Sequence, residues 1–95
     1  MIRARWNGEV IAEAERTIVI EGNHYFPIET VRPGALMPSP SRSLCFWKGL
    51  ASYYHVAAGD KINPDAAWSY PRPSPFARRI KNHVAFWQGV TVSRD

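Results

Sequence analysis

The pair Asn7-Gly8 constrains the fold of this chain more than any other feature of its sequence. It stands between two segments of β character, residues 2–6 and 9–13. Both residues tolerate the positive φ angles of a type I′ turn, so an Asn-Gly pair in this setting favours a two-residue β-hairpin. The run 17–21, in which residues 17–20 are β-branched, follows a polar turn and adds another strand. We therefore predict that the chain begins with consecutive strands.

Extended pieces and breaks alternate after this start. Residues 24–27 are expected to be extended and residues 28–32 to form one helical turn. Residues 33–43 contain three prolines, a glycine and several polar residues, which predicts a loop.

The aromatic segment 44–58 is predicted to be a strand, with Gly49 as a bulge or a point of close approach. Gly59-Asp60 and Asn63-Pro64-Asp65 have the residue types of turns. Residues 66–70 are expected to be extended.

One α-helix is predicted in the C-terminal half of the chain. Ser74 can serve as its N-cap and Pro75 as its first residue, where the missing N–H has no cost. The apolar residues that fall on one face at helical spacing are Phe76, Ala77, Ile80 and Val84. The helix is expected to end near His83, with a final strand or hairpin around Gly89.

Length and composition place these elements in one small domain over residues 1–95. A single cysteine excludes an internal disulfide and suits a reducing cytoplasm, and no signal peptide is expected at the start. No apolar run approaches the roughly 18 residues of a membrane span, so no membrane partner is expected. We predict a mainly β (α+β) fold, a small open β-sheet or barrel with one helix.

Several kinds of catalytic and metal site are missing from the sequence. There is no glycine-rich phosphate loop and no nucleophile elbow of the Gly-x-Ser-x-Gly type. The histidines His24, His55 and His83 and the thiol of Cys45 show no metal-ligand spacing, so neither a metal nor another cofactor is predicted.

The segment 45–54 is the best candidate for a functional patch, because it combines a thiol, an amine and several aromatic side chains. Cys45 is either a nucleophile whose pKa is lowered by Lys48 or a buried small hydrophobe. Trp47 and one of the two tyrosines, Tyr53 or Tyr54, are candidate walls of a small-molecule pocket. Adjacent residues of a strand point to opposite faces, so only one tyrosine can line a given pocket.

Polar residues elsewhere could complete such a site. Asp65 is either a general base or an ordinary turn residue, and Asn63 begins the same turn. His24 could act as an acid–base group near neutral pH or be a surface histidine. Trp68 supplies a further aromatic wall.

The net charge of +4 raises other partners. Arg78, Arg79 and Lys81 are the one basic cluster, and they could bind a protein or the phosphates of a nucleic acid. Three phosphate contacts are few for nucleic-acid binding, and scattered basic residues are also the ordinary state of a solvated surface. Surplus aromatic residues could instead be buried in a homodimer.

Five motifs in fixed order resemble those of one protein family. They cover nearly the whole chain, at residues 4–12, 23–27, 45–54, 63–71 and 83–87. This order resembles the bacterial family called domain of unknown function 427. The resemblance implies a compact, mainly β domain of the open, tent-like type seen in Mss4-like proteins.

The same resemblance carries two functional associations. Several proteins of the wider fold bind zinc through two pairs of cysteines, but this chain has only Cys45, so that site does not carry over. The family has also been labelled a nucleotidyltransferase, whereas this sequence has no phosphate loop or carboxylate pair for a metal–nucleotide complex. Family members often have proline where this chain has Phe46, which leaves the backbone beside Cys45 less restricted.

Together these features predict a domain that binds a small anionic or polar ligand in an aromatic pocket. Trp47, Tyr53 or Tyr54, and Trp68 are expected to form its walls. If the domain is an enzyme, Lys48 is expected to hold an anionic group and Asp65 or His24 to move a proton. The alternative is a non-enzymatic module that binds protein or nucleic acid through its basic helix.

Overall fold

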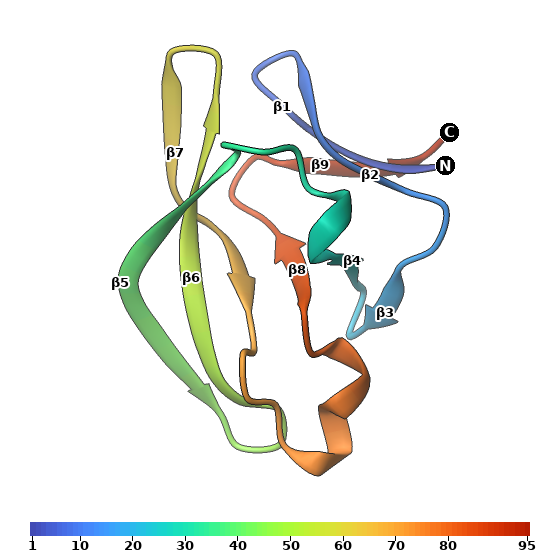
Figure 1. Cartoon of the computed structure of the whole chain (residues 1–95), viewed down its shortest axis with the longest axis vertical. Coiled ribbons are helices and arrows are strands. Elements are labelled where there is room, and N and C mark those ends of the chain that lie inside the picture. The colour runs from blue at the N-terminus through green and yellow to red at the C-terminus, as the bar shows by residue number, and fades with distance from the viewer.

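The computed structural model describes residues 1–95 and contains nine β-strands and two 3₁₀-helices. The strands form two separate antiparallel sheets (Figure 1). The smaller sheet has three strands in the order β2 (Glu9–Ala14), β1 (Ile2–Trp6) and β9 (Thr91–Arg94). Strands from the two ends of the chain therefore lie side by side in it.

The larger sheet has six strands. Their order is β3 (Ile18–Ile20), β4 (Asn23–Pro27), β8 (His83–Phe86), β7 (Lys61–Ser69), β6 (Gly49–Ala58) and β5 (Leu36–Cys45). Each sheet is a linear series of strands, so no barrel closes. The mainly β prediction is confirmed, and two open sheets replace the single sheet or barrel.

The N-terminal hairpin forms as predicted. Asn7 and Gly8 have φ angles of 52° and 74°, which is the positive pair that a type I′ turn requires. The same device joins β3 to β4, where Glu21 and Gly22 have φ angles of 54° and 80°.

Two groups of buried side chains lie on opposite faces of the six-stranded sheet. The larger group packs this sheet against the three-stranded one and includes Ile2, Ile11, Phe26, Val56 and Val84. The smaller group lies on the other face, under the 3₁₀-helix η2 (Pro75–Ile80), and includes Tyr25, Tyr70, Ala77, Ile80 and Ala85. Because neighbours along a strand alternate in direction, Phe26 joins the first group and Tyr25 the second.

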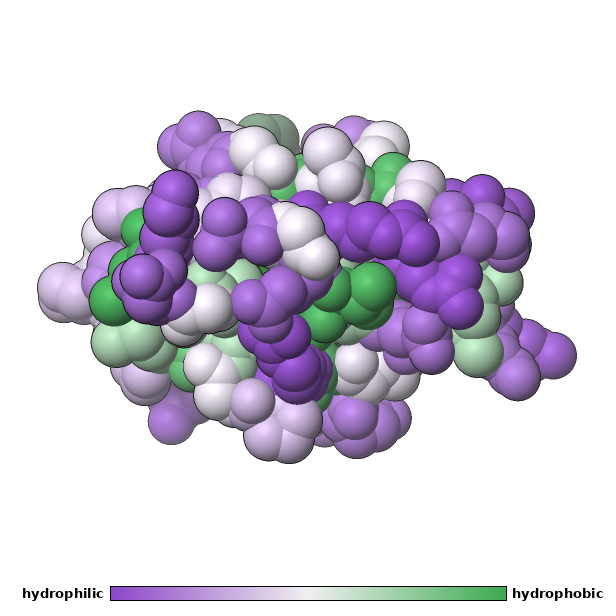
Figure 2. Space-filling view, turned by 90° about the horizontal axis from the view of Figure 1, so that it is seen from above, coloured by the Kyte–Doolittle hydropathy of each residue, from purple (hydrophilic) through white to green (hydrophobic).

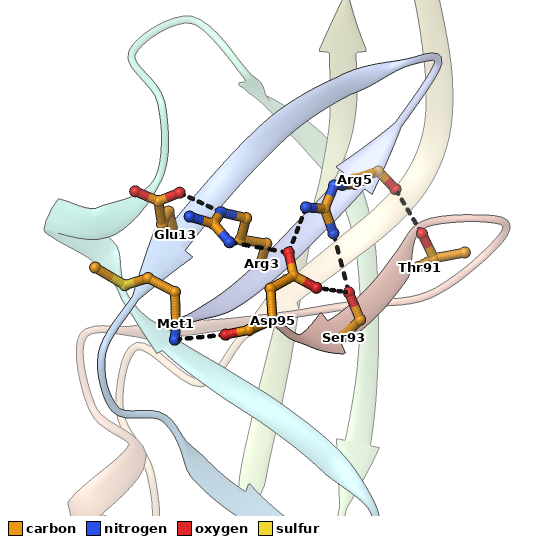
Figure 3. Close-up of polar contacts among 7 residues, drawn as sticks. All are labelled: Met1, Arg3, Arg5, Glu13, Thr91, Ser93 and Asp95. Atoms are coloured by element: carbon orange, nitrogen blue, oxygen red, sulfur yellow. Dashed lines mark hydrogen bonds and ion pairs between the residues drawn. The ribbon is translucent and has the colours of Figure 1, made fainter.

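Charged groups hold the end strands of the small sheet together (Figure 3). Arg3 on β1 is ion-paired with Glu13 on β2 and, at 2.9 Å, with Asp95 beyond β9. Arg5 is also paired with Asp95. Hydrogen bonds from Arg5 and Arg3 hold the pKa of the Asp95 carboxyl well below its usual range. The small sheet is thus fixed from both ends of the described chain.

The loop predicted for residues 33–43 is wrong, because most of it belongs to β5 (Leu36–Cys45). Pro38 and Pro40 are accommodated since β5 is the edge strand of its sheet, where a missing N–H leaves no partner unpaired. The pairing register with β6 shifts between Pro38 and Arg42, which places the prolines at an irregularity.

The α-helix predicted from Ser74 is also wrong. Ser74 does cap the segment by accepting a hydrogen bond from the Phe76 N–H at 3.3 Å, but only the 3₁₀-helix η2 follows. Ala77 has φ −122° and ψ 21°, outside the helical region. Only Ala77 and Ile80 are buried, and their spacing of three residues matches the 3₁₀ repeat. Phe76 points into solvent and Val84 belongs to β8, so the predicted apolar face does not exist.

Two smaller differences concern turns. The segment predicted as one strand over 44–58 is broken at residues 46–48, which form the turn between β5 and β6. The predicted turn at Asn63-Pro64-Asp65 is a bulge inside β7, where the register against β6 shifts and Asp65 has a φ of 51°. β8 and β9 flank Gly89 but enter different sheets, so they are not a hairpin.

The shorter 3₁₀-helix, η1 (Ile28–Thr30), confirms the single helical turn predicted after residue 27. The close approach predicted at Gly49 is present too. Its φ is 118°, and a Cβ added there would lie 3.2 Å from the carbonyl oxygen of Arg72.

Replacing Gly49 with alanine should therefore cost about 3 kcal/mol, because backbone strain and a backbone contact add together. The matched change Gly22→Ala, with φ 80° and nothing within 4 Å of the new Cβ, should cost only about 1 kcal/mol. Urea unfolding of both variants measures the difference. Equal losses would contradict the close approach.

Candidate functional site

A cavity of about 160 Å³ lies on the face of the six-stranded sheet that is turned away from the small sheet. Its polar lining is Lys48 and Asn23. Its aromatic lining is Tyr25, Tyr53, Trp68, Tyr70 and Trp87. The cavity is the one place where the structure gathers several of the predicted site residues.

Strand pairing explains how the aromatic walls meet. Tyr53 on β6 and Trp68 on β7 are directly opposite in the register, so they share one face. The Trp68 ring meets the ring of Tyr25 edge-on at 6.2 Å and that of Trp87 at 5.6 Å. The Trp68 indole N–H also donates to the Tyr25 hydroxyl oxygen at 3.2 Å. These contacts make a preformed aromatic box.

Lys48 brings the only positive charge of the cavity lining. It lies in the turn between β5 and β6, and its side chain is 8% exposed. Its ammonium group is ion-paired with Glu21, and Nζ lies 5.0 Å from the Trp47 ring centroid and 5.8 Å from that of Tyr70. Burial lowers the pKa of Lys48, but the hydrogen bond to Glu21 raises it, and the net shift is above the usual value. Lys48 therefore stays charged.

The phenols of Tyr70 and Tyr25 stay protonated at neutral pH. Burial raises the pKa of Tyr70 far above its usual value, and burial also raises the pKa of Tyr25. The Tyr25 oxygen accepts from Trp68, which leaves its own O–H proton free to donate. The lining thus offers one cation and several hydrogen-bond donors.

Other predicted residues lie beside the cavity without lining it. Trp47 contacts it through the Lys48 ammonium group. Cys45 is half-buried at the end of β5 and packs against the smaller buried group, so its surroundings are those of a small hydrophobe.

Tyr54 and His24 lie elsewhere. Tyr54 packs on the opposite face from Tyr53, where it lines a second cavity of about 130 Å³ and meets the Ser69 hydroxyl at 3.2 Å. The predicted alternation of the two tyrosines is therefore confirmed. His24 on β4 is hydrogen-bonded through Nδ1 to the Thr17 hydroxyl at 2.6 Å and does not line the cavity.

Asp65 and Asn63 are engaged in fastening strands. The Asp65 carboxylate accepts hydrogen bonds from Ser39 at 2.5 Å and Ser41 at 2.7 Å, both in the irregular part of β5. These bonds hold the pKa of Asp65 below its usual value. His55 Nδ1 accepts a hydrogen bond from the Asp65 backbone N–H at 3.0 Å. The same nitrogen lies 3.6 Å from Asp65 Oδ1, which is too far for a hydrogen bond. Asn63 donates to the Gln88 carbonyl at 2.6 Å.

Sequence reasoning missed four cavity residues and one partner. Tyr25, Tyr70, Trp87 and Asn23 come from segments whose pairing was not predictable, and Glu21 pairs with Lys48 across 27 positions. The available signal was the motif pattern, because all four residues fall within three of the five motifs, at 23–27, 63–71 and 83–87.

The basic segment is exposed. Arg78 and Arg79 in η2, and Lys81 after it, form no ion pair in the described chain. No group of three or more histidine, cysteine, aspartate or glutamate side chains is placed to hold a metal ion. None of the helices has the length and apolar character needed to cross a membrane.

Two open antiparallel sheets with an aromatic cavity on one face define a small mainly β domain. The chain belongs to the family described as Domain of unknown function (DUF427), whose model matches residues 1–94. No curated protein matches the chain.

The hydrogen bonds of the Asp65 carboxylate predict a contribution to folding stability that is lost at acid pH. Since the folded pKa lies below the usual 3.8, the contribution to stability is complete above that value and is lost as the pH falls through the folded pKa. Asp65→Ala should lower the melting temperature at pH 7, and the difference from wild type should shrink towards pH 3.

Asp60→Ala is the matched control, because the Asp60 side chain forms no hydrogen bond or ion pair and should change the melting temperature little at either pH. A gap between wild type and Asp65→Ala that stays constant down to pH 2 would contradict this role.

Proposed function

We propose that the aromatic cavity binds a small anionic molecule that has a flat apolar part. The observation that carries the proposal is the position of the buried Lys48 ammonium group in a lining that is otherwise almost entirely aromatic. Aromatic walls with a few convergent polar groups are typical of small-molecule sites.

The cavity volume limits the size of this ligand. A cavity of roughly 150 Å³ accommodates a benzene ring in an engineered protein. The present cavity is about 160 Å³, which suits one ring or a short chain with a carboxylate. Tyr53 and Trp68 form adjacent walls for the flat part, and Trp87, which is 44% exposed, lies at the edge.

Charge selects an anion. Lys48 is the only charged group of the lining, and Tyr25 can donate its O–H proton. Glu21 already supplies a carboxylate to Lys48 but is 55% exposed, so it can move into solvent without being left buried. A ligand carboxylate would replace that of Glu21.

Binding is better supported than catalysis. Of the four candidate catalytic side chains, only Lys48 lines the cavity; Asp65 and His24 are hydrogen-bonded elsewhere, and Cys45 packs behind the wall. General acid–base catalysis needs the proton-transfer group within hydrogen-bond reach of the substrate. We therefore assign the cavity to ligand binding.

Benzoate is a suitable probe, and Lys48→Met should weaken its binding at least tenfold. The variant keeps the length of the side chain while removing the charge that attracts the carboxylate. The exposed Glu21 can be solvated, so folding should persist. The measurement is a titration followed through the indole N–H signals of Trp68 and Trp87 in NMR spectra.

Two controls sharpen this titration. Neutral benzamide should bind wild-type protein more weakly than benzoate, and Lys61→Met, at the start of β7, should leave benzoate binding unchanged. Equal affinity for benzoate and benzamide, or equal affinity of wild type and Lys48→Met, would refute the anion site.

Glu21→Gln should strengthen benzoate binding. The exposed carboxylate competes for Lys48, and a competitor that occupies a site in nine molecules of ten weakens apparent affinity about tenfold. The same NMR titration measures the gain, with Glu29→Gln as the control at an exposed acidic residue that forms no ion pair. Weaker binding by Glu21→Gln would show that Glu21 orients Lys48 rather than competing for it.

A further inference from the structure

Four apolar side chains project into solvent at the end of the molecule that carries η2 and the turn between β5 and β6 (Figure 1). We call Leu44, Phe46, Leu50 and Phe76 the apolar tip. Phe46 is 95% exposed, Phe76 86% and Leu44 77%, with Leu50 at 52%. Two phenylalanines exposed to this degree at one place are unusual, because single exposed apolar residues are normal and clusters are not.

Backbone contacts bring these residues together. Leu44 on β5 and Leu50 on β6 are directly opposite in the strand register. Phe46 is in the turn that follows. The Ser74 N–H donates to the Lys48 carbonyl at 2.9 Å and its hydroxyl donates to the Trp47 carbonyl, which joins the start of η2 to this turn. Phe76 is two residues further on.

The backbone beneath the apolar tip is packed closely against neighbouring segments. The Gly49 backbone lies against Arg72 and Pro73 so closely that a Cβ would not fit freely. The Lys48 and Trp47 side chains point inward to the cavity region, and Phe46 between Cys45 and Trp47 points outward. The exposed phenylalanines are thus attached to a backbone that these contacts hold in place.

The charged residues of the segments that carry the tip are basic, and the acidic Glu21, which contacts the β5–β6 turn, is ion-paired with Lys48. Residues 40–58 and 66–94 contain no aspartate or glutamate. Arg72, which lines a hollow of about 200 Å³ with Leu50, forms no ion pair, and neither do Arg78, Arg79 and Lys81. All the acidic residues lie in other parts of the chain. Arg72, Arg78, Arg79 and Lys81 are therefore unpaired cations on the segments that carry the apolar tip.

The opposite end has a different character. Figure 2 looks at the molecule from that end, and hydrophilic residues cover most of the face, with hydrophobic ones in small areas. Acidic residues are present there, with Glu9 at the start of β2 and Asp60 in the turn between β6 and β7. The three most exposed large apolar side chains of the chain, Phe46, Phe76 and Leu44, all belong to the tip.

We propose that the apolar tip docks on the surface of an anionic lipid bilayer. Projecting Phe and Leu side chains would enter the interfacial region while the arginines stay at the level of the anionic headgroups, which is how apolar area and basic charge act together in interfacial binding. Such docking needs no membrane-spanning segment. A nucleic acid could stack its bases on the Phe46 and Phe76 rings but would leave the aliphatic Leu44 and Leu50 without a partner, whereas a bilayer takes up all four side chains.

Flotation with vesicles tests this proposal. Wild-type protein should bind vesicles of phosphatidylcholine with 30% phosphatidylglycerol at 0.1 M NaCl, and at least tenfold less to pure phosphatidylcholine or at 0.5 M NaCl, because salt screens the headgroup charge. The double variant Phe46→Ser/Phe76→Ser should lose at least tenfold of the binding. Both side chains are in solvent, so its melting temperature should match that of wild type.

Matched variants and competing partners make the result decisive. Val19→Ser/Ile62→Ser, at two residues 51% and 54% exposed outside the tip, should bind as wild type does. Arg78→Ala/Arg79→Ala should weaken binding to anionic vesicles only. The absence of vesicle binding, or binding that the Phe double variant retains, overturns the proposal. Two other results would also overturn it if wild type does not bind vesicles. One is a fluorescent oligonucleotide that binds wild type but not the Phe double variant. The other is a dimer that light scattering detects in wild type but not in that variant.

Discussion

The packing of the three-stranded sheet on one face of the six-stranded sheet is the contact on which the rest of the structure depends. It buries Ile2, Ile11, Phe26, Val56 and Val84 almost completely, and alanines fill the space between them. Small side chains let the two sheets approach closely. Because a 95-residue chain can build only a small core, this one interface contains most of its buried aliphatic residues.

The use of aliphatic residues at this interface affects which side chains occupy the other face of the six-stranded sheet. The six-stranded sheet carries a second set of side chains there, and these are mainly aromatic or alanine. Only the short helix η2 and the turn between β5 and β6 cover them. Large rigid rings under a small cover cannot fill the space completely, and the cavity beside Lys48 is the result. The candidate site is thus a consequence of how the core is divided between two faces.

The pairing of Lys48 with Glu21 connects this cavity to the edge of the sheet. A buried ammonium group is tolerated only when a partner and hydrogen bonds compensate for the loss of water. Glu21 supplies the partner from the tight turn between β3 and β4, and the Trp47 and Tyr70 rings lie close to the same charge. The pair thus consists of one buried cation and one exposed carboxylate, which is the feature on which the proposed exchange for a ligand anion rests.

Local signals in the sequence determined the elements whose geometry depends on a few adjacent residues. Asn7-Gly8 was sufficient for the first hairpin because the conformational preference of two residues selects the turn. Alternation along β6 likewise separated Tyr53 from Tyr54. Of the pocket predicted from motifs, Lys48, Tyr53 and Trp68 do line one cavity.

The features that depend on distant partners could not be predicted from the sequence and became known from the tertiary structure. Residues 36–45 form a strand despite two prolines, because an edge position makes their missing donors harmless, and residues 75–80 form a 3₁₀-helix, because only Ala77 and Ile80 can reach the core. The Asp65 carboxylate is hydrogen-bonded to Ser39 and Ser41 and does not line the cavity. Tyr25, Tyr70 and Trp87 do line it. The β character and the local turns were predictable from the sequence, since they follow from neighbouring residues. The choice of sheet, face and partner followed from strand order, which no local pattern encodes.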